Sequence, residues 1–434
     1  MPATSPTEYN FHPLRDALYN ELHIRPFYAL GSPQQITHLA ACCNNNEELQ
    51  QSYQLLCNLC HRYGINIPAQ DSVTFHEDFG NFTVHWELHA EFYSLTIMQP
   101  LAEEEPFNFT AIKLLPADWI SQLPGQMITA FHIVIDTGQL SYEPQALSRY
   151  FEGQQVMASN AYGKKAQVFS AFRLHGDGHG RFIIRHNGLS LAELGQLNRR
   201  LTDLETYRLL ALISLPMAKK IGPELLEMDR KLADILTVVT DLDTDRSERE
   251  HLEILTGVQA RLEAYRTETN RRFSGSRAYY QLVKDRLEGL KEEPLEGFLS
   301  IGEFINRRLN PAMRTCEAVQ LWMDDLSKRI ERASDLMRTR VNLIIQEQNR
   351  SQLTAMNRRS RLQFRLQETV EGLSIAAISY YAVGLLSYLL NGLPLKTWGI
   401  DKSALLAAFI PLVLLGTWFV TRRIKRRLIQ AQSD

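Results

Sequence analysis

Short alternating runs of apolar and polar positions characterise the first part of the chain. Residues 72–98 alternate and are rich in β-branched and aromatic side chains, residues 127–138 form another such run, and residues 168–188 form two runs around a Gly-rich turn. Period-two alternation bounded by Gly, Asn and Pro predicts β-strands. We therefore predict an α+β domain over residues 1–188, in which an antiparallel or mixed sheet carries flanking helices.

Beyond this region the apolar positions recur every three or four residues, which predicts helices. Ser190 and Glu193 have the spacing of a capping box and predict where the first of these helices begins. Pro216 and the Gly222-Pro223 pair are expected to interrupt the helices that follow. We therefore expect a helical domain of several helices over residues 189–310.

A long stalk helix is predicted next, over residues 311–371. Asn310 suits an N-cap and Pro311 suits the first helical position. Apolar residues then recur at three- and four-residue spacing as far as Ile344. A continuous helix of about 60 residues would be about 90 Å long. Such a helix needs partners for its apolar stripe, either earlier helices or copies of itself in a coiled coil.

Two uncharged apolar stretches follow, residues 373–393 and 403–421. A helix of about 20 residues spans about 30 Å, the thickness of the hydrocarbon core of a bilayer. Clusters of basic residues flank the pair on its outer sides: Arg358, Arg359, Arg361, Arg365, Arg422, Arg423, Lys425, Arg426 and Arg427. By the positive-inside rule, both outer ends are expected in the cytoplasm. We predict a two-helix C-terminal transmembrane hairpin over residues 372–421 and a basic cytoplasmic tail over residues 422–434. The competing interpretation is a pair of buried core helices.

Overall charge and cysteine content narrow the possible partners. The chain has 434 residues and a formal net charge of −2. Electrostatic binding of nucleic acid requires clustered cations, so no nucleic-acid partner is expected. The N-terminal segment has no basic stretch followed by an apolar run, so no secretory signal is expected. Without export, the five cysteines are not expected to form a disulfide framework.

One run of ionisable residues is a candidate ligand or metal site. His85, Glu87, His89 and Glu91 alternate along a predicted strand, and period two would place all four on one face. Imidazole and carboxylate groups at that spacing suit zinc or another divalent ion. Two other interpretations stay open, namely the solvated face of a half-buried sheet and an internal salt-bridge network.

Other short motifs favour structural roles. The segment from Cys57 to His61 matches a haem-attachment pattern, but its apolar spacing is also typical of one amphipathic helix. Gly176, Gly178 and Gly180 lie between two predicted strands, which favours a hairpin turn over a dinucleotide-binding loop. No catalytic constellation stands out, so we expect neither an enzyme nor a bound cofactor.

Four separate blocks carry a resemblance to a known family: residues 12–27, 86–92, 188–219 and 367–389. Together and in this order they resemble the bacterial "predicted membrane-anchored protein" family, whose domain is of unknown function. The resemblance covers nearly the whole chain. It implies no established activity and no catalytic residues.

The organisation is more distantly similar to that of CorA-type divalent-cation channels. Those proteins have a cytoplasmic α/β domain, a long stalk helix running into the first membrane helix, and a second membrane helix ending in a basic cluster, and they assemble as homopentamers. Their Gly-Met-Asn signature after the first membrane helix is absent here, and the nearest counterpart is Asn391-Gly392-Leu393-Pro394. The resemblance therefore does not extend to the loop in which those channels capture the hydrated ion.

Polar residues in the first apolar stretch are candidate pore-lining positions. Ser374, Tyr381 and Tyr388 recur every seven residues, and Ser387 and Asn391 lie near the far end. Polar groups inside a bilayer usually face a bundle interior or water. The alternative is hydrogen bonding between helices without conduction.

These observations lead to one preferred interpretation. The chain is expected to be a non-enzymatic, homo-oligomeric, multi-pass protein of the bacterial inner membrane, with its N-terminal bulk and its C-terminal tail in the cytoplasm. Its expected partners are the lipid bilayer and further copies of itself, and its expected role is that of a scaffold or sensor. The alternatives are a CorA-like ion channel or transporter, and an enzyme or metal-binding protein that uses His85 to Glu91.

Overall fold

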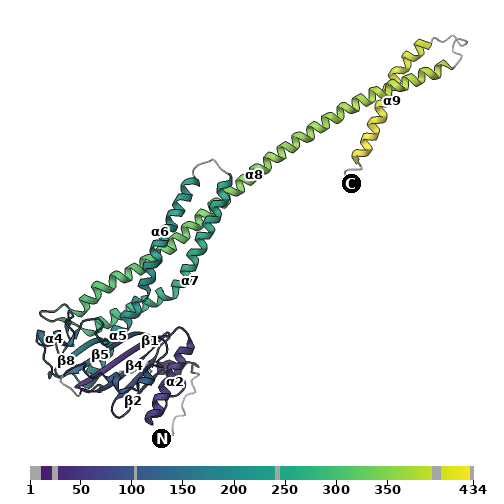
Figure 1. Ribbon diagram of the computed structural model, residues 1–434. Helices are drawn as coiled ribbons and strands as arrows, with labels where there is room; N and C mark the ends of the chain where they lie inside the picture. The colour runs from purple at the N-terminus through teal and green to yellow at the C-terminus, as the bar shows by residue number, and fades with distance from the viewer. Residues whose placement is uncertain (1–10, 22–27, 102–104, 240–244, 393–401, 431–434) are drawn as a thin grey trace, which may run out of the picture. The chain divides into compact units, whose positions relative to one another are not determined.

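The structure is a computed structural model, and it describes residues 11–21, 28–101, 105–239, 245–392 and 402–430 (Figure 1). The chain forms two compact units. The first comprises residues 1–242 and 253–334, and the second comprises residues 243–252 and 335–434. The fold is a mixed α+β domain followed by a long helix and a C-terminal apolar helix, which confirms the coarse architecture predicted from the sequence.

A single nine-stranded sheet forms the framework of the first unit. Its strands are β1 (Gln34–Cys42), β2 (Thr74–Asp78), β3 (Thr83–Leu88), β4 (Phe92–Pro100), β5 (Gln126–Asp136), β6 (Met157–Ala161), β7 (Ala166–Ser170), β8 (Gly180–His186) and β9 (Glu293–Pro294). They are arranged in the order β2-β3-β4-β1-β5-β8-β7-β6-β9. The strands pair antiparallel except β5 and β8, which pair parallel. The predicted mixed sheet is therefore confirmed.

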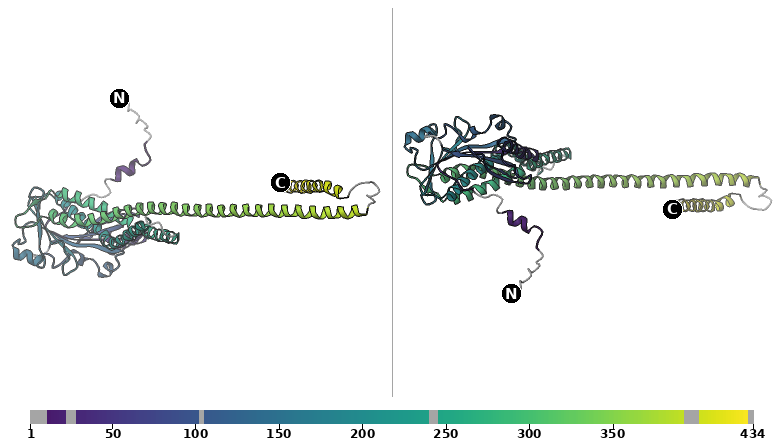
Figure 2. Two further views of the ribbon diagram at one scale, coloured as in Figure 1. Left: turned by 90° about the horizontal axis from the view of Figure 1, so that it is seen from above. Right: turned by 90° about the horizontal axis from the view of Figure 1, so that it is seen from below.

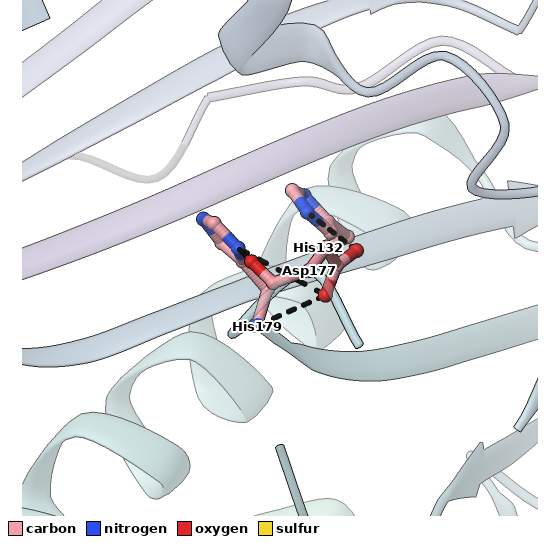
Figure 3. Close-up of side chains that lie close together, drawn as sticks. All are labelled: His132, Asp177 and His179. Carbon is pink, nitrogen blue, oxygen red and sulfur yellow. Dashed lines mark hydrogen bonds and ion pairs between the residues drawn. The ribbon is translucent and has the colours of Figure 1, made fainter. Parts of the chain in front are cut away.

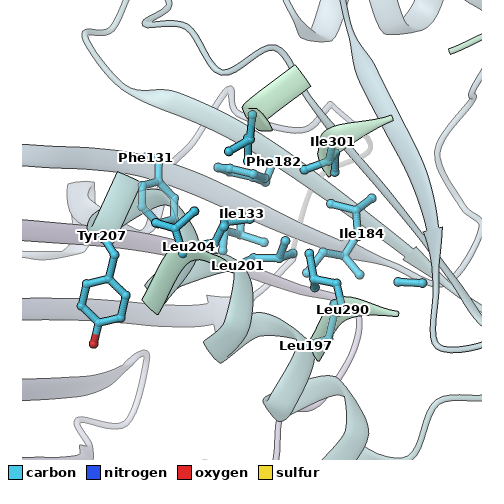
Figure 4. Packing of buried hydrophobic residues seen from close by; sticks show 14 of the residues in the cluster. Phe131, Ile133, Phe182, Ile184, Leu197, Leu201, Leu204, Tyr207, Leu290 and Ile301 are labelled. Carbon is cyan, nitrogen blue, oxygen red and sulfur yellow. The ribbon is translucent and has the colours of Figure 1, made fainter. Parts of the chain in front are cut away.

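The helix α5 (Leu191–Leu212) covers one face of this sheet. Leu197, Leu201 and Leu204 of α5 pack on Phe131 and Ile133 of β5 (Figure 4). Full burial of such a side chain contributes roughly 1.5–3 kcal/mol, so this layer fixes α5 against the sheet. The helix begins at the predicted capping box, in which the Ser190 hydroxyl accepts from the Glu193 amide and the Glu193 carboxylate accepts from the Ser190 amide.

Shorter helices cover the opposite face of the sheet. They are α2 (Asn46–Tyr63), the 3-10 helix η1 (Ala111–Leu114), α3 (Ala117–Ile120) and α4 (Pro144–Tyr150); a further short helix, α1 (Arg15–Glu21), precedes β1. The helix predicted around Cys57 is confirmed as α2, whose Leu56, Leu59 and Cys60 are buried. Alternate residues of one strand therefore face two different cores. In β1, Ile36 and Ala40 contact the α5 side, whereas Leu39 and Ala41 contact the α2 side.

Three longer helices pack side by side in the first unit: α6 (Ser214–Val239), α7 (Asp245–Leu290) from residue 253 onward, and α8 (Ile301–Asn391) as far as residue 334. An ion pair of 2.6 Å joins Arg329 of α8 to Asp229 of α6. The break predicted at Gly222-Pro223 is wrong, because α6 continues through Pro223.

The predicted start of the long helix at Pro311 is also wrong. The helix α8 begins ten residues earlier, at Ile301, and Pro311 lies inside it. The Ser300 hydroxyl accepts from the Glu303 amide at 3.2 Å and caps this start. Asn310 does not cap a helix, because its side-chain oxygen accepts a 2.7 Å hydrogen bond from the Tyr280 hydroxyl of α7.

The second unit contains the remainder of α8 and the apolar helix α9 (Lys402–Gln430). The two helices run in opposite directions and cross one another (Figure 1, Figure 2). The hydroxyls of Ser379 on α8 and Thr417 on α9 form a hydrogen bond of 2.7 Å. Both helices are long and apolar enough to cross a membrane, and their apolar windows are almost entirely unburied.

Candidate functional site

The α5 face of the sheet carries a cluster of buried ionisable side chains. His85 and Glu87 lie on β3 and point toward α5, and Glu87 is only 4% exposed. The interpretation of this strand as a solvated face is therefore wrong, because α5 covers it. His89 and Glu91 do not continue the strand, since β3 ends at Leu88 and both residues lie in the turn before β4.

Glu87 lies at the centre of this cluster. One carboxylate oxygen lies 2.7 Å from the Arg199 guanidinium of α5 and 3.3 Å from His85 Nε2, and the other lies 3.7 Å from His89 Nε2. Arg199 also contacts Asp203 at 3.1 Å. A buried carboxylate is tolerated when it is paired in this way.

The surroundings of Glu87 keep it ionised. Burial opposes its ionisation, but contacts with the His85 and His89 imidazoles and the charge of Arg199 outweigh burial and hold the pKa of this carboxyl well below its usual range. The pKa of Arg199 is raised, because Asp203 and Glu87 outweigh the effect of burial, which acts in the opposite direction. Glu87 and Arg199 therefore form a fixed ion pair at neutral pH.

His38 of β1 lies beside this cluster as a neutral imidazole. Its Nδ1 lies 2.8 Å from the Thr96 hydroxyl and its Nε2 lies 3.2 Å from the Thr206 hydroxyl, so both ring nitrogens have partners. Burial lowers the pKa of His38 to about 3.

A cavity of about 50 Å³ lies among these residues. Two buried polar atoms of its lining residues have no hydrogen-bond partner in the structure, namely Asn198 Oδ1 and Thr202 Oγ1, and His85 Nε2 has only the 3.3 Å contact with Glu87. A cavity of this volume holds a few water molecules. The site can therefore hold water or a small ion.

Glu91 belongs to a different set of contacts. Its carboxylate accepts a 2.7 Å hydrogen bond from the Tyr279 hydroxyl and lies 3.4 Å from Arg272, both on α7. Three of the four predicted ligand residues, His85, Glu87 and His89, line the cavity, and Glu91 does not. The assignment of these four residues as a ligand or metal site stays a prediction.

A second cluster lies on the opposite face of the sheet (Figure 3). His132 comes from β5, and Asp177 and His179 come from the β7–β8 turn. One potential ligand atom from each residue lies within 4.8 Å of the others. The cluster is not among the predicted sites, because the Gly-rich turn by itself indicates only a hairpin. The Asp-Gly-His sequence of that turn is the only local signal, and His132 joins it only through the pairing of β5 with β8.

The predicted pore-lining residues lie on α8 in the second unit. The side chains of Tyr381 and Tyr388 are 71% and 78% exposed. The Ser374 hydroxyl donates to the Val370 carbonyl of its own helix at 2.8 Å. Ser387 is half-buried and Asn391 is exposed at the end of the helix. Their assignment as pore-lining residues stays a prediction.

A family model described as a protein of unknown function (DUF3422) matches residues 10–428. Because this match covers nearly the whole chain, the chain belongs to that family. None of the curated proteins that were searched matches the chain. The resemblance to an uncharacterised family is thereby confirmed, whereas the family match gives no support for a relationship to CorA-type channels.

Proposed function

We infer that this protein is a non-enzymatic membrane protein, in which the α8–α9 hairpin crosses the bilayer and holds the α+β unit at the membrane surface as a scaffold or sensor. The observation that carries this proposal is the apolar surface of the hairpin. Large apolar side chains more than half exposed include Leu373, Tyr380, Leu385 and Leu389 of α8, and Leu412, Leu415, Phe419 and Val420 of α9.

The free energy of this surface supports insertion. Apolar surface left in water is unfavourable by roughly 25 cal/mol per Å², and monomeric soluble proteins rarely expose contiguous apolar patches above a few hundred Å². Near the bilayer centre each Leu, Ile, Val or Phe favours insertion by roughly 0.3–0.6 kcal/mol. The Ser379–Thr417 hydrogen bond pairs two hydroxyls that would otherwise face lipid.

The charge distribution supports the orientation. Arg358, Arg359 and Arg361 precede the apolar part of α8, and Arg422 and Arg423 follow that of α9. The positive-inside rule then places both flanks, and with them the α+β unit and the tail, on the cytoplasmic side of the inner membrane.

Self-association is part of the proposal. Between the first unit and the apolar part of α8, the large side chains of Leu353, Phe364 and Leu366 are each more than 60% exposed. Copies of the same helix in a bundle would cover them. The expected partners are thus the bilayer and further copies of this chain.

Protease protection in vesicles of known orientation tests the topology. The full chain carries one epitope tag before Met1 and another after Asp434. In inverted inner-membrane vesicles, added protease is expected to remove both tags, and in intact spheroplasts it is expected to remove neither. Removal of either tag from spheroplasts would contradict the proposed orientation. If the detergent-solubilised protein has the mass of a monomer, the proposed self-association is wrong.

An ion-conducting ring is a second candidate. The observation in its favour is that Tyr381 and Tyr388 are exposed and lie on the side of α8 opposite Ser379, whose hydroxyl contacts Thr417 of α9. Such a face is available to line an axis between copies. Reconstitution into liposomes loaded with a Mg²⁺-sensitive dye tests it: ion entry that is changed in Tyr381→Ala would support conduction, and a flux no greater than that of empty liposomes would exclude it.

A further inference from the structure

We propose that His132, Asp177 and His179 form a binding site for a divalent transition-metal ion such as Zn²⁺. This proposal concerns the first unit alone and is independent of the membrane hairpin. It also departs from the expectation, drawn from the sequence, that no cofactor is bound.

The sheet brings these three residues together. In the parallel pair of β5 and β8, His132 is in register with Arg181. The turn immediately before β8 therefore carries Asp177 and His179 to the side of His132. The rings of His132 and His179 are stacked with centroids 4.4 Å apart, and His132 Nε2 lies 3.6 Å from Asp177 Oδ2 (Figure 3).

The donor set and its spacing fit a metal. Two imidazoles and one carboxylate are ligands that Zn²⁺, Fe²⁺ and related ions take, with water in an open position. Ligand atoms about 2.0–2.1 Å from a tetrahedral ion lie roughly 3.4 Å from one another. The His132–Asp177 distance of 3.6 Å is close to this value. To complete the coordination, the side chain of His179 has to move. This residue lies on a turn and its side chain is 20% exposed.

Both imidazoles make a hydrogen bond through Nδ1. His179 Nδ1 lies 2.8 Å from the Asp177 backbone carbonyl, which can only accept, so Nδ1 carries the proton and Nε2 the lone pair. His132 Nδ1 lies 2.9 Å from the Thr37 hydroxyl, which can act as donor or acceptor. Metal-bound histidines characteristically donate their other ring N–H to such partners.

The charges at the site are compatible with a bound cation. The side chain of His132 is 1% exposed, so its ring is held away from solvent. The Arg181 guanidinium lies 3.4 Å from Asp177, but it is held more closely by Glu152 at 2.8 Å and by the Tyr150 carbonyl at 2.6 Å. Asp177 can therefore turn to an ion while Arg181 keeps its other partners.

Titration of the purified full chain with Zn²⁺ and with Co²⁺ tests the site. Calorimetry is expected to show one ion bound per chain, and bound Co²⁺ is expected to give visible absorption bands. His179→Ala and Asp177→Asn are expected to weaken binding by roughly tenfold or more. His61→Ala is the matched control, since it removes an exposed histidine of α2 that is remote in sequence.

Each outcome of these titrations either supports the proposed metal site or overturns it. Loss of binding in both turn variants, with His61→Ala unchanged and the metal-free melting temperatures alike, supports the site. Absence of stoichiometric binding in the native chain would overturn it. Equal binding by His179→Ala and by the native chain would also overturn it, because the ions would then be held elsewhere.

Discussion

Replacement of Arg199 by Met tests whether the buried ion pair of Glu87 and Arg199 stabilises the fold. Glu87 Oε1 lies 2.7 Å from the guanidinium, and its side chain is 5% exposed. Removing one partner of a buried pair costs about 3–5 kcal/mol, because the other charge stays buried without compensation. Arg199 is a quarter exposed, so we expect a value near the lower end, about 3 kcal/mol.

The second partner of Arg199 adds little to this value. Asp203 loses its 3.1 Å contact with Arg199 but keeps a 2.8 Å contact with Arg286 of α7. The double variant Arg199→Met/Glu87→Gln leaves no unpaired charge at Glu87. It is therefore expected to be more stable than the single Arg199→Met variant, by about 2 kcal/mol or more.

Urea unfolding of the full chain, followed by tryptophan fluorescence, measures these differences. Trp86 and Trp119 are buried beside the sheet and report on the first unit. At a slope of about 3 kcal/mol per M, the Arg199→Met midpoint should fall by about 1 M with an unchanged slope. Arg307→Met breaks an exposed ion pair with Glu303 and should shift the midpoint by less than the equivalent of about 1 kcal/mol. Equal midpoints for Arg199→Met and Arg307→Met would refute the reasoning.

Four further substitutions have defined outcomes. The pKa of His38 is lowered to about 3, so the unfolded chain takes up a proton near pH 6.5 that the folded chain does not bind. The free energy of unfolding therefore falls as the pH falls from about 6.5 toward 3. In urea titrations at several pH values, His38→Gln should reduce the slope of this loss by about 1.4 kcal/mol per pH unit. Ser190→Ala removes the capping box and should lower the free energy of unfolding by about 1 kcal/mol. Gly195→Ala should lower the melting temperature, because its new Cβ would collide with the Tyr28 carbonyl, whereas Gly257→Ala meets open space and should gain about 0.5–1 kcal/mol.

Local patterns in the sequence predict the elements of the first unit well. Alternation over residues 72–98 corresponds to β2, β3 and β4, and the capping box at Ser190 marks the start of α5. The start of α8 is harder to predict, because Ser300 and Glu303 have the same capping spacing but Pro311 is also compatible with a helix start. Apart from that start, the predicted domain boundaries stay predictions.

The sites were harder to predict because they depend on contacts between distant segments. Alternation places His85 and Glu87 on one face of a strand, but it does not show that Arg199, more than a hundred residues later, covers that face. Similarly, His132 and His179 meet only through the parallel pairing of β5 with β8. Neither pairing has a local sequence signal.

The membrane hairpin is tested most directly by alkaline carbonate extraction of membranes from cells that express the full chain. Carbonate strips proteins held by charge or by soluble partners, whereas helices buried in hydrocarbon stay with the lipid. We expect the protein to sediment with the membranes and to float with them in a density gradient. Recovery of the intact chain in the carbonate supernatant would contradict the assignment of α8 and α9 to the bilayer.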